Sequence, residues 1–277
     1  MRRKILTVLL AMGFIGGTVW LLGTLSSGLS NNAYANPGKG KDCSKCHGSK
    51  AKDIAKGFKG FTDTFMTETC DGFSSEGRNP YFVLEPGYQL VLEGVEKKAA
   101  LHLTITVLNE TKPFRDLDLG GGVIADVDAR VVEERETRNG LLAEISRNYF
   151  AICDRTNSVF YFGEDVDIYD ATGTTVIDHS GSWLAGVNGA RPGIAMSGVI
   201  LLGGKYFQEV APGLALDRAE ILSMTEAIET PAGAFQSCLK TLETSALEKG
   251  KGYKFYAPGI GLIKDGSIEL TQYGMVP

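Results

Sequence analysis

Alternating apolar and polar residues, interrupted by short turn sequences, run through the chain from residue 79 onward and constrain its fold more than any other feature. For example, Leu101, Leu103 and Ile105 fall on one face of an extended strand, and His102 falls on the other. The same reading predicts strands at 88–95, 99–108, 123–138, 141–153, 159–162, 166–169, 174–177, 234–244, 253–256, 261–264 and 267–273. We find no sequence repeat and no alternation of strands with helices, so the connections are expected to be local and antiparallel.

Two dipeptides mark tight turns between these strands. Asn139-Gly140 separates two long strands, and Asp265-Gly266 precedes the last one. Both suit a turn whose central residues need positive φ. Long strands joined in this way twist and curl, so the sequence predicts a mainly β fold. The expected architecture is an antiparallel meander forming a barrel or half-barrel over residues 79–277, preceded by a short helical or irregular segment.

The N-terminal sequence has the features of an export signal. Basic residues 2–4 precede an apolar run at 5–25, and the small-x-small sequence Ala33-Tyr34-Ala35 follows. We therefore expect residues 1–35 to be a signal peptide and the mature protein to be periplasmic or secreted. The alternative is an uncleaved anchor, because about 20 apolar residues can span a bilayer. Membrane association is expected only in that case.

The decisive motif is Cys43-Ser44-Lys45-Cys46-His47. Two thiols at this spacing can each add to one vinyl group of a single haem, and the next histidine is then placed to bind the iron. Residues 37–66 resemble the haem-attachment segment of c-type cytochromes. The resemblance implies one covalent haem c on Cys43 and Cys46, with His47 as the proximal ligand, and electron transfer as the activity.

Other uses of the two thiols remain open: a redox dithiol, a structural zinc site or a simple disulfide. The chain also departs from the cytochrome pattern, because no complete cytochrome fold fits before Asn79. We therefore divide it into a signal peptide (1–35), a haem-binding segment (36–78) and a β domain (79–277).

The distal iron ligand has several candidates. Met66 offers a thioether 19 residues after His47, although a single methionine is more often a filler of apolar gaps. His102 and His179 are the remaining histidines, and an open or partner-supplied position is the third alternative.

A second resemblance covers nearly all of residues 79–277. It is to a poorly described group of exported bacterial β-rich proteins, and it implies a shared fold but no reaction. The sequences that carry it are Asn79-Pro80-Tyr81-Phe82, Tyr161-Phe162-Gly163-Glu164-Asp165, Gly181-Ser182-Trp183, Arg191-Pro192-Gly193 and Tyr256-Ala257-Pro258-Gly259-Ile260-Gly261-Leu262.

Charge is unevenly distributed along the chain. Residues 37–60 contain seven lysines and two aspartates, whereas the whole chain has a net charge of −5. The basic segment is either a solvated tail or a docking surface for an acidic redox partner. An acidic body would repel phosphates, so no nucleic-acid partner is expected.

Three cysteines lie outside the motif. Cys153 and Cys238 fall in predicted strands, and we expect them to form a disulfide; two unpaired buried thiols are the alternative. Cys70 would then be free or pair between chains.

These features favour a monohaem electron carrier or redox subunit on a β scaffold. The alternative is a β-barrel binding module for a lipophilic or peptide ligand, with the haem as a sensor or accessory. A haem enzyme such as a peroxidase is a weaker third hypothesis. We assign no catalytic residues, because no Ser-His-Asp order and no phosphate-binding loop stands out.

Overall fold

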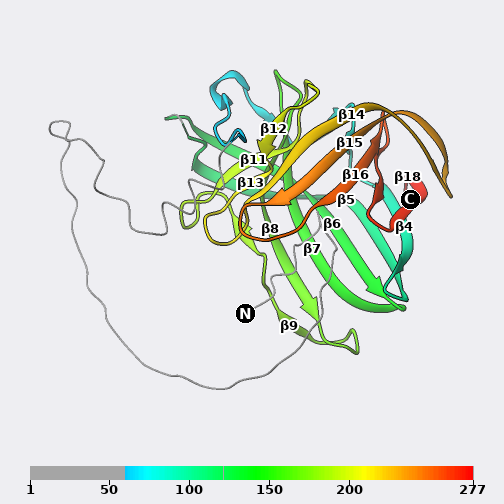
Figure 1. Ribbon diagram of the computed structural model, residues 1–277. Helices are drawn as coiled ribbons and strands as arrows, with labels where there is room; N and C mark the ends of the chain where they lie inside the picture. The colour runs from blue at the N-terminus through cyan, green and yellow to red at the C-terminus, as the bar shows by residue number, and fades with distance from the viewer. Residues whose placement is uncertain (1–59, 121, 277) are drawn as a thin grey trace.

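The computed structural model describes residues 60–120 and 122–276, which form a nearly closed antiparallel β-barrel (Figure 1). In chain order the described elements are the 3-10 helix η1 (Thr67–Thr69) and the strands β1 (Phe73–Ser74), β2 (Gly77–Asn79), β3 (Phe82–Leu84), β4 (Tyr88–Glu96), β5 (Ala99–Asp118), β6 (Ile124–Arg138), β7 (Leu141–Cys153), β8 (Val159–Tyr169), β9 (Val176–Asp178), β10 (Trp183–Leu184), β11 (Arg191–Met196), β12 (Lys205–Phe207), β13 (Glu209–Val210), β14 (Asp217–Thr230), β15 (Gly233–Ser245), β16 (Gly252–Ala257), β17 (Gly261–Asp265) and β18 (Ile268–Met275).

Strand pairing carries the sheet almost completely around the barrel axis. The strands β4 to β8 pair in sequence order, and β8 then pairs with β11. Residues 205–210 join the two ends of the sheet, because β12 pairs with β14 and β13 pairs with β11. The hairpins from β14 to β18 return to β4. This closure leaves few exposed sheet edges, which are the usual sites of unwanted strand pairing.

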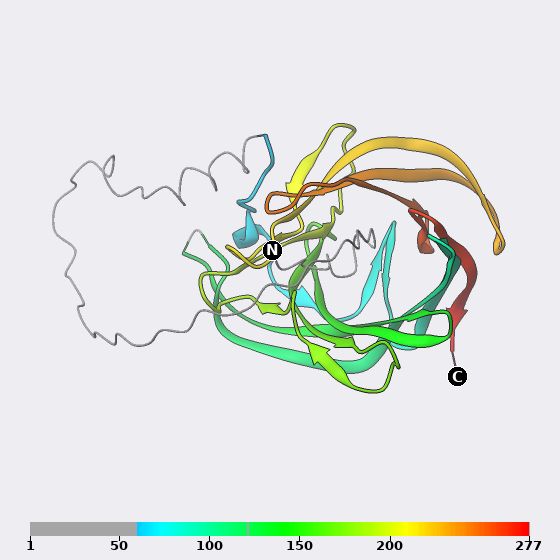
Figure 2. The same cartoon turned by 60° about the horizontal axis from the view of Figure 1, so that its bottom comes forward.

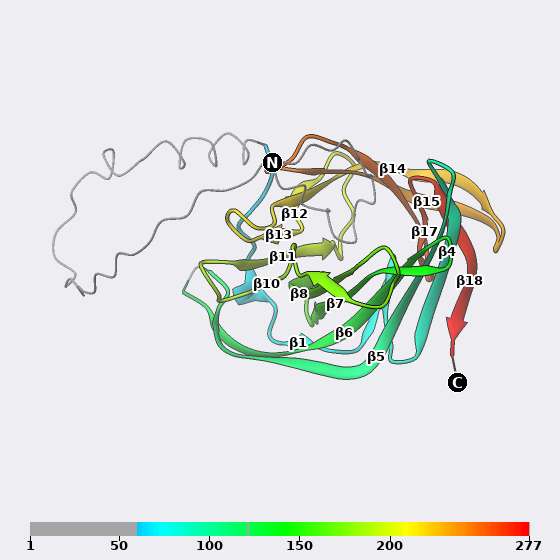
Figure 3. The same cartoon turned by 90° about the horizontal axis from the view of Figure 1, so that it is seen from below.

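The short β2–β3 hairpin lies inside the barrel rather than in its wall (Figures 2 and 3). Asn79 holds the hairpin in place, because its side-chain amide donates hydrogen bonds to the backbone carbonyls of Asn157 (2.8 Å) and Ser197 (3.0 Å). Its carbonyl oxygen accepts a hydrogen bond from the backbone N–H of Tyr81. Residues of the hairpin therefore contribute to the interior surface of the barrel.

The predicted fold class is confirmed, and so are most of the predicted strands. Asn139 and Gly140 have φ values of 52° and 78°, as the turn between β6 and β7 requires. The ranges 159–162 and 166–169 are parts of one strand, β8, in which Gly163 has a φ of 143°. A Cβ at Gly163 would collide with the backbone of Trp183, so a larger residue there would push β10 away from β8.

The predicted disulfide partner of Cys153 is wrong. Cys153 is bonded to Cys70, with their Cα atoms 4.9 Å apart, and Cys238 is a buried free thiol. The reason is that β1, three residues after Cys70, pairs with the end of β7 and brings Phe73 opposite Cys153. In the sheet, β7 is separated from β15, which carries Cys238, by several intervening strands.

Within the described residues, no helix has the length and apolar character needed to cross a membrane.

Candidate functional site

The residues of the haem motif, Cys43, Cys46 and His47, lie outside the described part of the chain. The described remainder of the predicted 36–78 segment is attached to the barrel. Thr62 forms an isolated parallel bridge with Tyr206, and Phe65 makes an edge contact with Phe160, with ring centroids 5.8 Å apart. The Cys70–Cys153 disulfide fixes the same segment covalently. Residues 62–70 are therefore held against the barrel by backbone, ring and disulfide contacts.

Met66 lies directly before η1, and its side chain is 70% exposed. Its backbone carbonyl accepts hydrogen bonds from both the backbone N–H and the hydroxyl of Thr69. The thioether is therefore held at the surface of the barrel instead of filling an apolar gap. It remains a predicted iron ligand.

Both candidate histidines already have polar contacts. The ring nitrogens of His102 lie 2.9 Å from a Glu93 carboxylate oxygen and 3.1 Å from the Thr104 hydroxyl. The Nδ1 of His179 lies 2.8 Å from the Val166 carbonyl and 2.9 Å from Asp167. To bind iron, His102 would have to give up one of these two contacts. His179 would not, because its Nε2 makes no hydrogen bond to a described residue.

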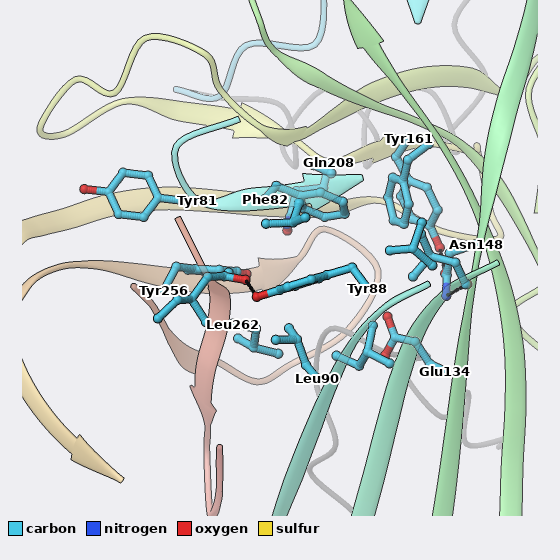
Figure 4. Close-up of a pocket in the computed structure, with 18 residues that line it drawn as sticks. Tyr81, Phe82, Tyr88, Leu90, Glu134, Asn148, Tyr161, Gln208, Tyr256 and Leu262 are labelled. Carbon is cyan, nitrogen blue, oxygen red and sulfur yellow. Dashed lines mark hydrogen bonds between the residues drawn. The ribbon is translucent and has the colours of Figure 1, made fainter. Parts of the chain in front are cut away.

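The barrel interior contains a cavity, with about 750 Å³ of unfilled space counting the part that is continuous with solvent (Figure 4). We call it the aromatic cavity because six rings line it: Tyr81, Phe82, Tyr88, Phe150, Tyr161 and Tyr256. The ring of Phe150 stacks on Tyr161, with centroids 4.7 Å apart, and meets Phe82 edge-on at 5.1 Å. The Tyr88 hydroxyl donates a hydrogen bond to the Ile260 carbonyl, which fixes its ring across the cavity.

Three polar side chains interrupt this apolar lining, namely Glu134, Asn148 and Gln208. Asn148 accepts a hydrogen bond from the Tyr161 hydroxyl, at 2.5 Å. Gln208 has its Nε2 3.4 Å from a Glu243 oxygen, but its buried Oε1 has no hydrogen-bond partner among the described residues. The Glu134 carboxyl likewise makes no hydrogen bond to another described side chain or backbone group. Few, well-placed polar groups in an apolar pocket are typical of ligand sites.

Glu134 belongs to a set of buried acidic residues that we call the carboxyl cluster. Its six members come from six different strands: Glu134 on β6, Glu144 on β7, Glu164 on β8, Glu209 on β13, Asp217 on β14 and Glu243 on β15. Lys254 on β16 is completely buried and pairs with Glu243 and Asp265, each at 3.4 Å. Among the described residues, Glu243 forms a salt bridge, and the other five members of the cluster form none.

Burial keeps much of this cluster protonated near neutral pH. Loss of hydration raises the pKa of Glu134 and of Glu144 to about 8, and that of Asp217 to about 6. The pKa of Glu243 rises to about 7 for the same reason, and nearby Lys254 limits the increase. Burial also raises the pKa of Glu164 well above its usual value, reinforced by the neighbouring Glu144. Mutual repulsion of the acids adds to the effect of burial.

Glu164 precedes Asp165, Asp167 and Asp170 in the sequence, a pattern typical of an acidic strand end that faces water. The structure places it 2% exposed inside the barrel, while Asp165 next to it points outward. The sequence of β6 carries no signal for Glu134 either, because Arg130 and Glu136 share its strand face, and such a charged pattern is typical of a side that faces water. No group of three or more potential metal ligands is found in residues 60–120 and 122–276.

Comparison with known proteins adds little to this geometry. No family model and no curated protein matches the sequence. One solved structure shares 14% sequence identity over 72% of this chain and 100% of the other, with a TM-score of 0.34. It is described as a "putative lipoprotein from Parabacteroides distasonis". The strand pairing and the cavity define the class of the described structure as an antiparallel β-barrel with an internal aromatic cavity.

Proposed function

We propose that this protein is an exported monohaem c-type cytochrome-like protein, in which the barrel carries a covalent haem and the haem transfers electrons. The observation that supports the proposal is the motif Cys43-Ser44-Lys45-Cys46-His47 following an export signal. The cysteines would hold the haem, and His47 would supply the proximal ligand. The Cys70–Cys153 disulfide is consistent with an oxidising, extracytoplasmic location.

The attachment of residues 62–70 to the barrel supports a defined position for the haem. Thr62 lies 15 residues after His47, so the haem segment is a short tether. Its lysine-rich composition suits an acidic redox partner, and steering by exposed charges weakens as salt is added. The electron-transfer rate should therefore fall as ionic strength rises. A rate independent of salt would exclude such docking.

The decisive experiment is a haem stain on a denaturing gel after co-expression with a haem-attachment system. The parent protein should retain haem, and Cys46→Ala should weaken or abolish the stain. Cys238→Ala is the matched control, because Cys238 is a cysteine of the barrel and should leave attachment unchanged. Absence of stain in the folded parent protein would overturn the proposal.

The distal ligand can be tested on the same material. If Met66 binds the iron, the oxidised protein should show the weak far-red absorption band of methionine-ligated haem, and Met66→Ala should remove it. Retention of an unchanged spectrum in Met66→Ala would exclude Met66. Five-coordinate haem that binds carbon monoxide would favour sensing or catalysis over electron transfer.

The aromatic cavity favours a second function, in which the barrel is a binding module for a lipophilic ligand. Its lining is predominantly apolar, and its few polar groups are buried within it. Closed β-barrels of this kind commonly hold one small ligand. The two functions are compatible, because the haem motif and the cavity involve different residues.

A further inference from the structure

The polar end of the aromatic cavity has hydrogen-bonding capacity that the described protein does not use. Glu134 and Asn148 lie on adjacent strands, β6 and β7, and appear together at one end of the cavity in Figure 4, whereas Tyr81 lies at the other. Glu134 is 9% exposed and lines the cavity, and no hydrogen bond joins its carboxyl to another described residue. The Oε1 atom of Gln208 is also buried and without a partner there. Leaving a buried acceptor such as Gln208 Oε1 unsatisfied is costly, so a ligand that forms hydrogen bonds with it and with the Glu134 carboxyl would be favoured.

The surroundings of Glu134 specify the charge of that ligand. The groups that act on it electrostatically are Lys254 on β16, Glu144 on β7, Asp265 on β17 and Glu136 on β6 itself. Three of the four are acids, and Lys254 is already paired with Glu243 and Asp265. Above pH 8, where Glu134 and Glu144 are ionised, a carboxylate ligand would meet repulsion here. A cation would offset the excess of acidic groups.

The remainder of the lining also suits a cation with an apolar body. The faces of aromatic rings attract ammonium groups, and a carboxylate close to several rings is a recurring arrangement for binding them. Phe82, Tyr88, Phe150 and Tyr161 supply rings, while Leu90 and Leu262 supply purely apolar surface. The cavity therefore offers ring faces to the ammonium group of an amphipathic amine and apolar surface to the rest of the molecule.

We propose that the aromatic cavity binds a small lipophilic amine, whose ammonium group pairs with the Glu134 carboxylate while its apolar part lies among the aromatic rings. This inference rests on the binding-module function proposed above. It assigns a ligand class to the cavity and a recognition residue to β6.

Binding has a proton balance that can be measured. Burial raises the pKa of Glu134 to about 8, so in the empty cavity its carboxyl is mostly protonated at pH 7. An amine that enters as the ammonium ion displaces this proton to solvent, and one ion pair forms. Amine affinity should therefore increase between pH 6 and pH 8.5, with release of up to one proton on binding near pH 7.

The test uses the mature protein and three probes of similar shape: 2-phenylethylamine, 2-phenylethanol and phenylacetate. Titration calorimetry at pH 8.5 should show the amine binding at least tenfold more tightly than the alcohol, and phenylacetate binding most weakly. Calorimetry near pH 7 in buffers of different ionisation enthalpy reports the released proton.

The critical variant is Glu134→Gln, which keeps the shape of the protonated side chain. In this variant the Kd of the amine should lie within about twofold of the Kd of the alcohol, and proton release on amine binding should be abolished. Glu133→Gln is the matched control, because Glu133 is the adjacent residue on β6 and its carboxylate contacts Arg147 outside the cavity. This control should retain the tenfold preference.

The outcomes separate the two proposals. Equal binding of amine and alcohol, or a preference retained in Glu134→Gln, would overturn the amine inference while leaving the binding module intact. Failure of all three probes to bind would overturn both. If Glu134→Gln does not fold, as judged by near-ultraviolet circular dichroism, Phe82→Leu replaces it and should weaken amine binding more than alcohol binding. Equal weakening of the two would then overturn the inference.

Discussion

The aromatic cavity and the carboxyl cluster occupy the same barrel interior, but burial stabilises only one of them. The rings of the cavity gain free energy when they leave water, and Phe150 illustrates this with ring contacts on two sides. The acids of the cluster lose hydration, and several of them keep their protons as a result. A fold can bury both kinds of group if the free-energy cost of dehydrating the acids is offset by the gain from burying the rings.

The largest effect should come from the aromatic side. Phe150→Ala removes a buried ring that stacks on Tyr161 and contacts Phe82. We expect the free energy of unfolding to fall by about 4 kcal/mol, independently of pH, as measured by urea denaturation. A loss below about 1 kcal/mol would show that the cavity walls collapse around the missing ring.

The next effect should come from the lysine beside the cluster. Lys254→Met leaves Glu243 and Asp265 without their cation and should lower stability by about 3 kcal/mol at pH 8. Lys264→Met is the control, because its pair with Glu269 is partly exposed and should contribute less than about 1 kcal/mol. The loss in Lys254→Met should shrink at pH 5, where Glu243 is protonated.

The third prediction concerns pH. Unfolded glutamates lose their protons near pH 4.5, whereas burial raises the pKa of folded Glu134 and Glu144 to about 8. The folded state thus binds more protons in this window, so stability should be greatest at its acidic end and fall as pH rises from 4.5 to 8.

Glu134→Gln removes one of the groups that stay protonated in the folded state. The fall in the free energy of unfolding between pH 5.5 and 7.5 should therefore be smaller than in the wild type by about 2 kcal/mol. Urea denaturation at a series of pH values measures it. Glu133→Gln should leave the dependence unchanged. An identical slope in the wild type and Glu134→Gln would place the Glu134 pKa outside this window and contradict the prediction.

The smallest effect should appear at Tyr161, whose ring belongs to the cavity and whose hydroxyl reaches Asn148. Tyr161→Phe keeps the ring and removes the hydrogen bond, so it should cost about 1 kcal/mol in thermal or urea unfolding. Tyr253→Phe, at an exposed ring, should change stability by less than about 0.5 kcal/mol. Equal effects in the two variants would mean that the buried hydrogen bond contributes nothing net.

Much of the fold could be predicted because strand alternation and turn chemistry are local. The β4–β5 and β6–β7 hairpins follow directly from their sequence patterns and, for the latter, from Asn139-Gly140. The strand β14 is absent from the predicted strands, and five of its 14 residues are Ala or Glu, which favour helices in isolation or are depleted in strands. Pairing with β12 and β15 overrides that preference.

By itself, the sequence determined the antiparallel β class and supplied the motif Cys43-Ser44-Lys45-Cys46-His47 on which the proposed haem depends, because both rest on spacing between near neighbours. Tertiary structure alone decided which cysteine reaches Cys153, that Glu164 faces inward, and that acids from six strands meet beside an aromatic cavity. These outcomes depend on the closure of the sheet into a barrel and on the position of the β2–β3 hairpin. Both bring together residues far apart in the chain, and no local pattern encodes such contacts.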